Sequence, residues 1–430
     1  MTEPAGANLD RTYAARLDEA DALAAMRAQF HIPRRADGSD TIYLCGHSLG
    51  LAPKQAARIV QEEMDVWAQQ GVAGHFESAR PWLSYHEQLC TSLARLAGAQ
   101  PLEVVAMNSL TVNLHMMLAS FYRPTPQRHK ILIEKRAFSS DRYAVATHIR
   151  QRGGDPTQSL LALEPSGDDG IFRTDALCDL LQREGPSIAT VLLPGVQYLT
   201  GQCFDMAAIT AQAQRQGCKV GFDLAHAMGN VPLRLHDWNV DFAVWCGYKY
   251  LNGGPGGIGG CFVHERHARA FDLPRLAGWW GHDKKTRFDM PEDFVPLAGA
   301  EGWQVSNPSI LSAAPLLASL PLFDAAGMAA LRGKSLQLTN YLATLLTARL
   351  PTDMTLLTPQ DAQARGCQLS IRLHRPPQQA RAVHSALNRQ GYICDWREPD
   401  VIRVAPVPLY NSFSDVWAFV EGLAHELRAT

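Results

Sequence analysis

The chain lacks most of the features that mark secreted, nucleic-acid-binding and metal-binding proteins. Its nine cysteines are an odd number and none is spaced as Cys-x-x-Cys, which favours free thiols over disulfides. Lys plus Arg number 40 and Asp plus Glu 42, and this net charge of −2 offers no general attraction to nucleic acid or an anionic membrane. H-E-x-x-H and Cys/His metal motifs are absent as well. These absences predict a cytoplasmic protein without a metal and without nucleic-acid or membrane partners.

Long apolar runs and low-complexity segments are also missing. The amino-terminal residues are mixed and acidic, without the apolar core of a signal peptide. The longest apolar stretch, near 310–323, contains Pro315 and Pro321 and is too short to span a bilayer. Hydrophobic residues nevertheless make up 46% of the 430 residues, enough for a sizeable core. A chain of this length predicts a large domain and a smaller one.

Strand-like and helical segments alternate in the middle of the chain. Apolar, strand-like runs are expected at 103–107, 130–134, 188–193, 218–223, 241–245 and 258–263. Helices are expected between most of them, near 111–121, 139–151, 173–184 and 205–216. The alternation predicts an α/β domain with a largely parallel sheet, and such sheets bind ligands beyond the carboxyl ends of their strands.

The two ends of the chain have a different pattern. Residues 11–30 are expected to form one amphipathic helix, and Pro53 and Pro81 to open two more. A long helical stretch covers 310–349, and strand-like and helical runs alternate after it, at 367–373, 377–390, 401–405 and 414–428. The expected regions are an amino-terminal helical segment packing on the small domain (1–45), a large cofactor-binding α/β domain (46–309) and a small α+β domain (310–430).

One lysine stands in an unusual context. Lys249 follows an apolar run, where an unpaired charge is costly, and a glycine-rich stretch (252–260) comes next. Upstream, a strand-like run ends in Asp223, and His226 follows three residues later. Alone, such a Lys is usually solvated and such an Asp is often a turn former or helix cap. Together they are typical of pyridoxal phosphate enzymes, in which the lysine bonds to the cofactor and the acid holds a proton on its ring nitrogen.

Three further positions have two interpretations each. Thr111, at a strand–helix junction, either binds a phosphate together with the helix N-terminal N–H groups or only caps the helix. Phe138 either stacks on a flat cofactor ring or belongs to the core. Arg403, in a strand-like run, either clamps a carboxylate with its planar guanidinium or forms an ordinary ion pair.

Taken together, the motifs resemble the kynureninase family, whose members are pyridoxal phosphate enzymes of fold type I. The resemblance runs from about Tyr43 to Phe413, and its most specific segments are GWWGH (278–282) and RVAPVPLYNSF (403–413). Other matching segments are GHSLGLAPK (46–54), RPW (80–82), NSLTVNLH (108–115), VGFDLAHAMGNVPLRLHDW (220–238), YKYLNGGPGG (248–257) and SNP (306–308). The resemblance implies a large domain with a mainly parallel seven-stranded sheet and a smaller α+β domain. It also implies hydrolysis of L-kynurenine, or its 3-hydroxy form, to anthranilate, or its 3-hydroxy form, and L-alanine in tryptophan catabolism.

The resemblance also implies a role for each matched residue. Lys249 matches the lysine that bonds to the cofactor, Asp223 the partner of the ring nitrogen, and Tyr248 a phosphate ligand and proton relay. The other cofactor-site matches are Leu110, Thr111, Phe138, Asp141, His226, Trp279 and Asn307. Trp279 and Asn307 match residues supplied by the partner subunit, which implies a homodimer with shared sites. The substrate-site matches are Arg403 for the carboxylate and, near the aromatic end, His75 and Ser48.

Two departures and two alternatives stand beside this interpretation. His47 occupies a position where the family often has Asn, and Pro194 one where it often has Ser or Thr, so one phosphate contact is expected to be missing or made by water. The first alternative is another fold type I enzyme, such as a cysteine desulfurase or a class V aminotransferase. A desulfurase needs a catalytic Cys on a mobile loop, and no Cys lies in an obvious Gly/Ser-rich loop of this sequence. The second is a non-catalytic regulator, which would be expected to carry a DNA-binding domain.

Overall fold

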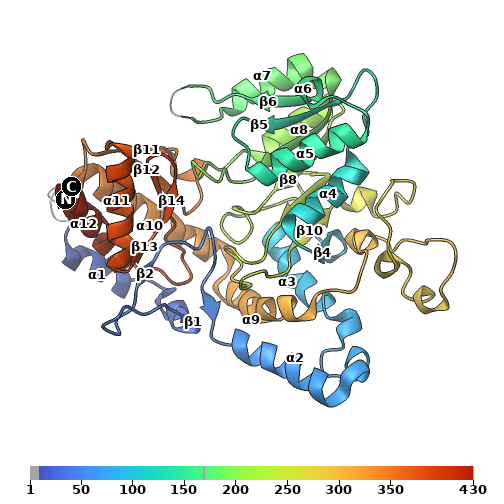
Figure 1. Ribbon diagram of the computed structural model, residues 1–430, viewed down its shortest axis with the longest axis horizontal. Coiled ribbons are helices and arrows are strands. Elements are labelled where there is room, and N and C mark those ends of the chain that lie inside the picture. The colour runs from blue at the N-terminus through green and yellow to red at the C-terminus, as the bar shows by residue number, and fades with distance from the viewer. Residues whose placement is uncertain (1–8, 168–169, 430) are drawn as a thin grey trace.

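The computed structural model describes residues 9–167 and 170–429 and shows two bodies side by side (Figure 1). The larger body is built on a seven-stranded sheet with the order β4-β10-β9-β8-β7-β5-β6. β10 is antiparallel to both of its neighbours, and the other pairs are parallel, which confirms the predicted α/β class and mainly parallel sheet. The strands are β4 (Val104–Ala106), β5 (Lys130–Glu134), β6 (Leu160–Leu163), β7 (Ile188–Pro194), β8 (Lys219–Asp223), β9 (Phe242–Trp245) and β10 (Gly260–Val263).

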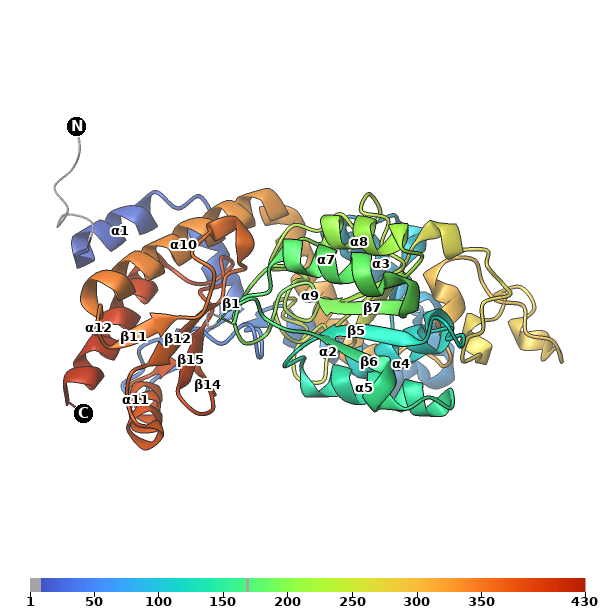
Figure 2. The ribbon, with the colours of Figure 1, turned by 90° about the horizontal axis from the view of Figure 1, so that it is seen from above.

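Helices cover both faces of this sheet, which is why its central strands read as continuous apolar runs. Figure 2 shows α7 (Thr174–Glu184) and α8 (Met206–Arg215) on one face and α4 (Leu110–Phe121) and α5 (Ser139–Gln151) on the other. A separate hydrophobic cluster fills each side of the sheet. A short helix, α6 (Pro156–Ser159), leads into β6, the one strand of this sheet that the sequence pattern does not predict.

The smaller body has a four-stranded antiparallel sheet and its own hydrophobic core. Its strands, in the order β11-β12-β15-β14, are β11 (Met354–Leu356), β12 (Leu369–Leu373), β15 (Val401–Val404) and β14 (Asp395–Arg397). Its helices are α10 (Met328–Arg349), α11 (Pro377–Arg389) and α12 (Phe413–Ala429), and α1 (Arg11–Glu19) packs against α12. The amino-terminal strand β2 (Ile42–Tyr43) pairs with β13 (Tyr392–Ile393) of this body.

Residues 11–30 do not form the single helix that the sequence predicts. α1 ends at Glu19, and a 3-10 helix (Ala24–Gln29) and strand β1 (Phe30–His31) follow. The chain leaves the helix because the Asp21 carboxylate accepts the N–H of Leu23 and pairs with the buried Lys334, whose Nζ lies 2.7 Å away.

The two helices that Pro53 and Pro81 are expected to open also begin later than predicted. Pro53 ends strand β3 (Ala52–Pro53) before α2 (Ala56–Gln70), and Pro81 precedes a 3-10 turn before α3 (Glu87–Ala97).

The apolar stretch after residue 309 forms a single helix despite its prolines. α9 (Ile310–Ala326) runs through Pro315 and Pro321 and packs against α2 and α3 of the large body, at the bottom of Figure 1. α10 begins after Gly327, whose φ of +74° marks a bend of 82° between the two helices. Among the described residues no single helix is long and apolar enough to cross a membrane, and the bent pair α9–α10 passes that test by length and composition alone. The domain boundary at residue 310 stays a prediction.

Candidate active site

A pocket of about 520 Å³ lies where the parallel strands β5, β7 and β8 end. Its place is the one that the sheet topology favours for a ligand. Eight of the predicted site residues line it: Leu110, Thr111, Phe138, Asp141, Asp223, His226, Tyr248 and Lys249. The lining residues that the sequence reasoning did not propose are Glu134, Ser140, Val196, Tyr198 and Ala225.

Lys249 points its amine at a histidine. Its Nζ lies 3.2 Å from Nε2 of His226 and 5.8 Å from the centre of the Phe138 ring. Burial, and then the charge of Lys249, lowers the pKa of His226 well below its ordinary value, so this imidazole is neutral. Its Nε2 shares a hydrogen bond with the lysine amine. Its Nδ1 has no partner among the described residues, so a buried ring nitrogen is left for a ligand.

Three carboxyl groups meet at the strand ends. Asp223 ends β8. Its Oδ1 accepts a hydrogen bond from the Ala225 N–H at 2.7 Å, and its carboxylate also accepts a hydrogen bond from Asp141. Burial and the charge of Asp223 raise the pKa of Asp141 well above its ordinary value, so Asp141 keeps its proton and donates it. Burial and Asp223 also raise the pKa of Glu134, which ends β5, to about 8. Burial raises the pKa of Asp223 too, but the Ala225 N–H, Asp141 and Lys249 act against this rise and favour its charged form. The strand-end signal that predicts Asp223 marks Glu134 as well.

The N-terminus of α4 forms another side of the pocket. Ser109 makes no side-chain cap, so the first N–H groups of the helix are left for a ligand, beside the lining residues Leu110 and Thr111. A Cβ on Gly259 would lie 3.3 Å from the Leu110 nitrogen and 2.7 Å from the Trp245 carbonyl oxygen, so the close approach of this segment depends on glycine. Pro194 lines the pocket without a side-chain donor.

These groups fit pyridoxal phosphate. The amine of Lys249 suits an aldehyde, and the Asp223 carboxylate suits a protonated ring nitrogen. The uncapped helix end suits a phosphate, and the Phe138 ring beside Lys249 suits a flat aromatic cofactor.

Arg403 lies beside this pocket, in β15, and is 1% exposed. Its Nε and Nη2 contact Oδ2 of Asp395 at 2.6 and 2.5 Å, and its Nη1 donates to the Tyr198 carbonyl at 2.6 Å. Tyr198 lines the pocket and its ring meets that of Phe138 edge-on, with centroids 5.3 Å apart. Arg403 therefore forms an ion pair and also lies next to the pocket, so the two sequence-based interpretations of this residue are compatible.

The segment 195–203 fastens the pocket wall to the small body. The carbonyls of Tyr198 and Leu199 accept hydrogen bonds from Arg403, Gln368 and Ser370. Further backbone hydrogen bonds join Gly366 to Gly201 at 3.2 Å and Cys203 to Ala364 at 2.9 Å. Val196 and Tyr198, which line the pocket, thus belong to a loop held by the small sheet.

The remaining predicted residues lie outside the pocket of this chain. Ser48 Oγ is 3.5 Å from Asp395 Oδ1, on the side of Arg403. His75 ends a 3-10 helix (Gly71–His75), and its ring meets Trp82 edge-on. Trp279 is 40% exposed, and Asn307 is exposed just before α9. A segment within about 270–300, yellow to gold in colour, projects from the large body at the right of Figures 1 and 2. One chain alone does not bring His75, Trp279 or Asn307 to the pocket lining.

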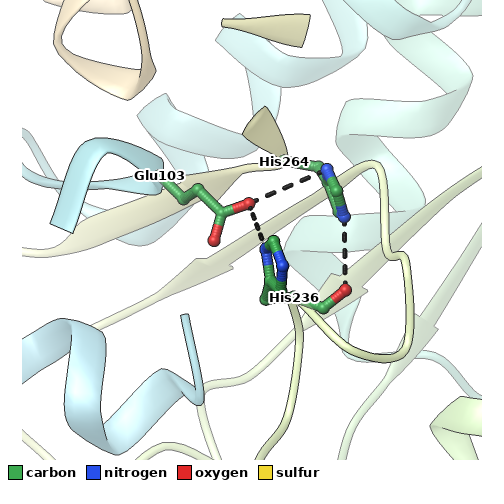
Figure 3. A group of neighbouring side chains, drawn as sticks. All are labelled: Glu103, His236 and His264. Atoms are coloured by element: carbon green, nitrogen blue, oxygen red, sulfur yellow. Dashed lines mark hydrogen bonds and ion pairs between the residues drawn. The ribbon is translucent and has the colours of Figure 1, made fainter. Parts of the chain in front are cut away.

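A second titratable cluster, formed by Glu103, His236 and His264, lies at the opposite edge of the sheet (Figure 3). The three could be mistaken for a metal site, but hydrogen bonds already engage their ligand atoms. Oε1 of the buried Glu103 accepts from His236 Nδ1 at 3.0 Å and from the Glu265 N–H at 2.8 Å. His264 Nδ1 accepts the Arg266 N–H at 3.1 Å and its Nε2 contacts the His236 carbonyl at 3.2 Å. The cluster ties three loops together.

Comparison with known proteins points to one family. Residues 331–423 match the family model described as the kynureninase C-terminal domain. A protein named kynureninase from Koribacter versatilis is 54% identical over 99% of this chain and all of its own length. Proteins of the same name from Xanthomonas oryzae pv. oryzae and Myxococcus xanthus are 55% and 54% identical over 96% and 100% of the chain, and 97% and 100% of their own.

Solved structures share the fold at low identity. A cysteine desulfurase from Escherichia coli superposes with a TM-score of 0.75 at 20% identity, covering 95% of this chain and 98% of its own. A C-DES mutant with glycine covalently linked to its PLP cofactor superposes with a TM-score of 0.74 at 20% identity, covering 93% and 98%. At this identity the likeness concerns the fold alone, and it places the chain's architecture among those of fold type I.

Proposed function

The chain belongs to the kynureninase family, and from this premise we propose that it hydrolyses L-kynurenine to anthranilate and L-alanine with pyridoxal phosphate as its cofactor. The observation that carries the proposal is the 54–55% identity to kynureninases over 96–100% of the chain. The 3-hydroxy form of the substrate is proposed as a second substrate, since both share the amino acid and ketone groups. The reaction is a step of tryptophan catabolism.

We propose that the pocket residues hold the cofactor. Lys249 would bond to its aldehyde, the α4 N-terminus with Thr111 would bind its phosphate, and Phe138 and His226 would contact its ring. When bound, pyridoxal phosphate supplies an electron sink that makes the substrate α-proton acidic. Asp223 would hold a proton on the ring nitrogen, and Asp141, which donates a hydrogen bond to Asp223, would support the charge of Asp223.

Two side chains are proposed to move protons. The amine of Lys249 is the base at the α-carbon, and His226 orients it through the contact of 3.2 Å. The bond between the β-carbon and the ketone carbon breaks by hydrolysis. The hydroxyl of water goes to the ketone carbon, which becomes the carboxyl carbon of the aromatic acid, and a proton goes to the β-carbon, which becomes the methyl group of alanine. Burial and the nearby Cys246 raise the pKa of Tyr248, so its hydroxyl keeps a proton that it can give to the β-carbon.

Arg403 is proposed to bind the substrate α-carboxylate. Its buried guanidinium lies next to the pocket wall, where a planar fork of donors can orient the carboxylate. Ser48, close to the same ion pair, and His75 are proposed for the aromatic end of the substrate.

We also propose a homodimer with shared sites, in a cytoplasmic setting. In one chain Trp279 and Asn307 are exposed and are not part of the pocket lining, as residues that serve a partner's site would be. The nine cysteines are free thiols, and none of them is exposed, which suits a reducing compartment. The division into residues 1–45, 46–309 and 310–430 completes this proposal.

The thiols also weigh against a cysteine desulfurase. Burial is the leading cause that raises the pKa of all nine, so none is an activated thiolate. The direct test mixes purified protein and L-kynurenine and follows anthranilate fluorescence. Anthranilate and alanine in equal amounts are the expected products. Sulfide and alanine release from cysteine, without anthranilate from kynurenine, would overturn the proposal in favour of a desulfurase.

A further inference from the structure

Asp395 is the centre of the charged group beside the pocket. It begins β14, directly opposite Arg403 on β15. Its Oδ2 accepts from Nε of Arg403 at 2.6 Å and from Nε of Arg397 at 3.0 Å, and Ser48 Oγ lies 3.5 Å from its Oδ1. The buried His47 also approaches, with Nε2 4.0 Å from Oδ2. One carboxylate thus contacts both arginines of this region.

The contacts leave part of the Arg403 guanidinium for a ligand. A guanidinium has five N–H donors. In Arg403 the Nε–H and one Nη2–H face Asp395, and one Nη1–H goes to the Tyr198 carbonyl. The two remaining donors are one on each terminal nitrogen. A carboxylate that binds end-on needs one donor from each of these nitrogens, so Asp395 need not leave when such a ligand arrives.

The charges around Asp395 also match a single carboxylate. Arg397 and Arg403 bring two positive charges and Asp395 one negative charge. Burial, and next the charge of Arg403, lowers the pKa of His47 well below its ordinary value, so His47 adds no charge. The net positive charge of one equals what one α-carboxylate neutralises. Without Asp395, the partly exposed Arg397 would repel the buried Arg403 at close range.

We propose that Asp395 is a positioning residue for Arg403. It binds the edge of the guanidinium formed by Nε and Nη2, so that the edge formed by the two terminal nitrogens faces the α-carboxylate of the substrate. The proposal rests on the proposed function and deepens it. Asp395 acts through Arg403 and does not touch the substrate. The sequence alone does not indicate this pairing, because it depends on the register of β14 against β15.

A rival role is that Asp395 competes with the substrate for Arg403. The two roles can be distinguished by moving the carboxylate of residue 395 while its charge is kept. A charge-preserving change, Asp395→Glu, moves the carboxylate outward by one methylene, so it displaces Arg403 if Asp395 positions it. A competing anion would act much the same from either position. Asp395→Asn removes the charge. If Asp395 competes with the substrate, this change strengthens carboxylate binding. If Asp395 positions Arg403, the same change weakens carboxylate binding.

The test compares ligands with and without a carboxylate on the holoenzyme. L-Alanine and ethylamine differ only in that group, and the absorption of the bound cofactor reports the dissociation constant of each. We expect Asp395→Asn and Asp395→Glu to weaken L-alanine binding at least tenfold and to change ethylamine binding less than twofold. The KM of L-kynurenine should rise in parallel, with a smaller change in kcat. Asp353→Asn, which breaks an Arg–Asp contact of 2.7 Å with Arg375 in the same body, is the matched control and should change neither ligand.

Each other outcome overturns the proposal. Tighter L-alanine binding in Asp395→Asn with unchanged binding in Asp395→Glu would make Asp395 a competing anion. Equal losses for L-alanine and ethylamine would make its role purely structural. Should Asp395→Asn not fold, Asp395→Glu alone decides between these roles. The outcome is separable from the proposed function, since L-alanine binding is measured without turnover. If the wild-type protein released no anthranilate, the proposed function would be wrong. Weaker binding of L-alanine but not of ethylamine by the Asp395 variants would still support the positioning role.

Discussion

At the scale of single residues, the site depends on how each buried charge is partnered. Arg403 is buried and paired, whereas Glu134 is buried beside another acid without a cation near enough to lower its pKa. Both lie within or next to the pocket, and each therefore gives a specific expectation for a substituted protein.

Replacing Arg403 tests the carboxylate clamp. Loss of a desolvated, charge-assisted pair typically costs about 2–5 kcal/mol, or roughly 30-fold to several thousand-fold in kcat/KM. We expect Arg403→Leu to lose activity on L-kynurenine in that range and to keep its cofactor, because Arg403 does not line the pocket that contains Lys249. Arg403→Lys should recover only part, since a point charge lacks the fork. A kynurenine analogue without the carboxylate should be a poor substrate for both proteins. Wild-type activity in Arg403→Leu would move the role to Arg397.

Glu134 makes stability depend on pH. Burial raises its pKa from an ordinary 4.5 to about 8, so between these values the folded chain holds a proton that the unfolded chain has released. Its contribution is therefore fully present below about pH 4.5 and is lost as the pH rises through about 8. We expect Glu134→Gln, which keeps a neutral side chain, to hold its Tm better than wild type from pH 5 to pH 9. Thermal unfolding of the cofactor-free proteins measures this, and parallel pH curves would show that Glu134 is ionised throughout.

Residue-scale prediction from sequence is possible where one position carries its own signal, and the structure brings such positions together in the pocket. Asp223 and Lys249 stand out because they follow apolar runs, and strand ends of a parallel sheet meet at one edge. Asp395 carries no such signal, because its proposed role depends on Arg403 in the neighbouring strand β15. Trp279 and Asn307 carry no such signal either, since both are exposed in the chain and only the family resemblance marks them.

At the scale of elements, the predicted strands and helices of the large sheet lie close to the observed ones because apolar runs there are buried on both sides. β6 escapes prediction because half-buried residues make up most of it. The helix predicted over 11–30 fails because the Asp21 contacts with Leu23 and Lys334 outweigh helix propensity. α9 runs through two prolines because tertiary packing against α2 and α3 outweighs the loss of two backbone hydrogen bonds.

The loops joined by Glu103 also respond to pH. Its hydrogen bond with His236 raises the pKa of that imidazole, so the stabilisation is full below the ordinary value of 6.5 and is lost as the pH rises through the raised value. We expect His236→Ala to lower Tm more at pH 6 than at pH 9. His374→Ala, which removes a histidine bonded to Thr355, is the control and should lower Tm equally at both. A loss of Tm on adding a chelator would instead identify a metal in this cluster.

At the scale of the whole molecule, the exposed Trp279 and Asn307 predict a shared site. Lys249→Ala should be inactive because it lacks the base, and Asn307→Ala because it lacks a group that the partner needs. Mixing the two variants should restore part of the activity, since a hybrid dimer has one site with both residues intact. Activity and mass of the exchanged dimers measure this. If subunits exchange without any recovery, a single chain supplies the whole site.

The loop 195–203 sets a distance as well as a shape. It is bonded to the small sheet beside Arg403, and Lys249 follows strand β9 of the large sheet. Under the proposed roles of these two residues, the loop therefore affects the spacing between the sites for the substrate amine and the substrate α-carboxylate. One residue of extended chain spans about 3.3 Å. Adding or removing one residue there would displace the Tyr198 and Leu199 carbonyls, to which Arg403 and Ser370 donate, by more than the length of a carbon–carbon bond. Because the amine and the carboxylate of every α-amino acid share one carbon, redesign of this enzyme for another α-amino acid should keep the length of this loop, whereas a β-amino acid would need a different length.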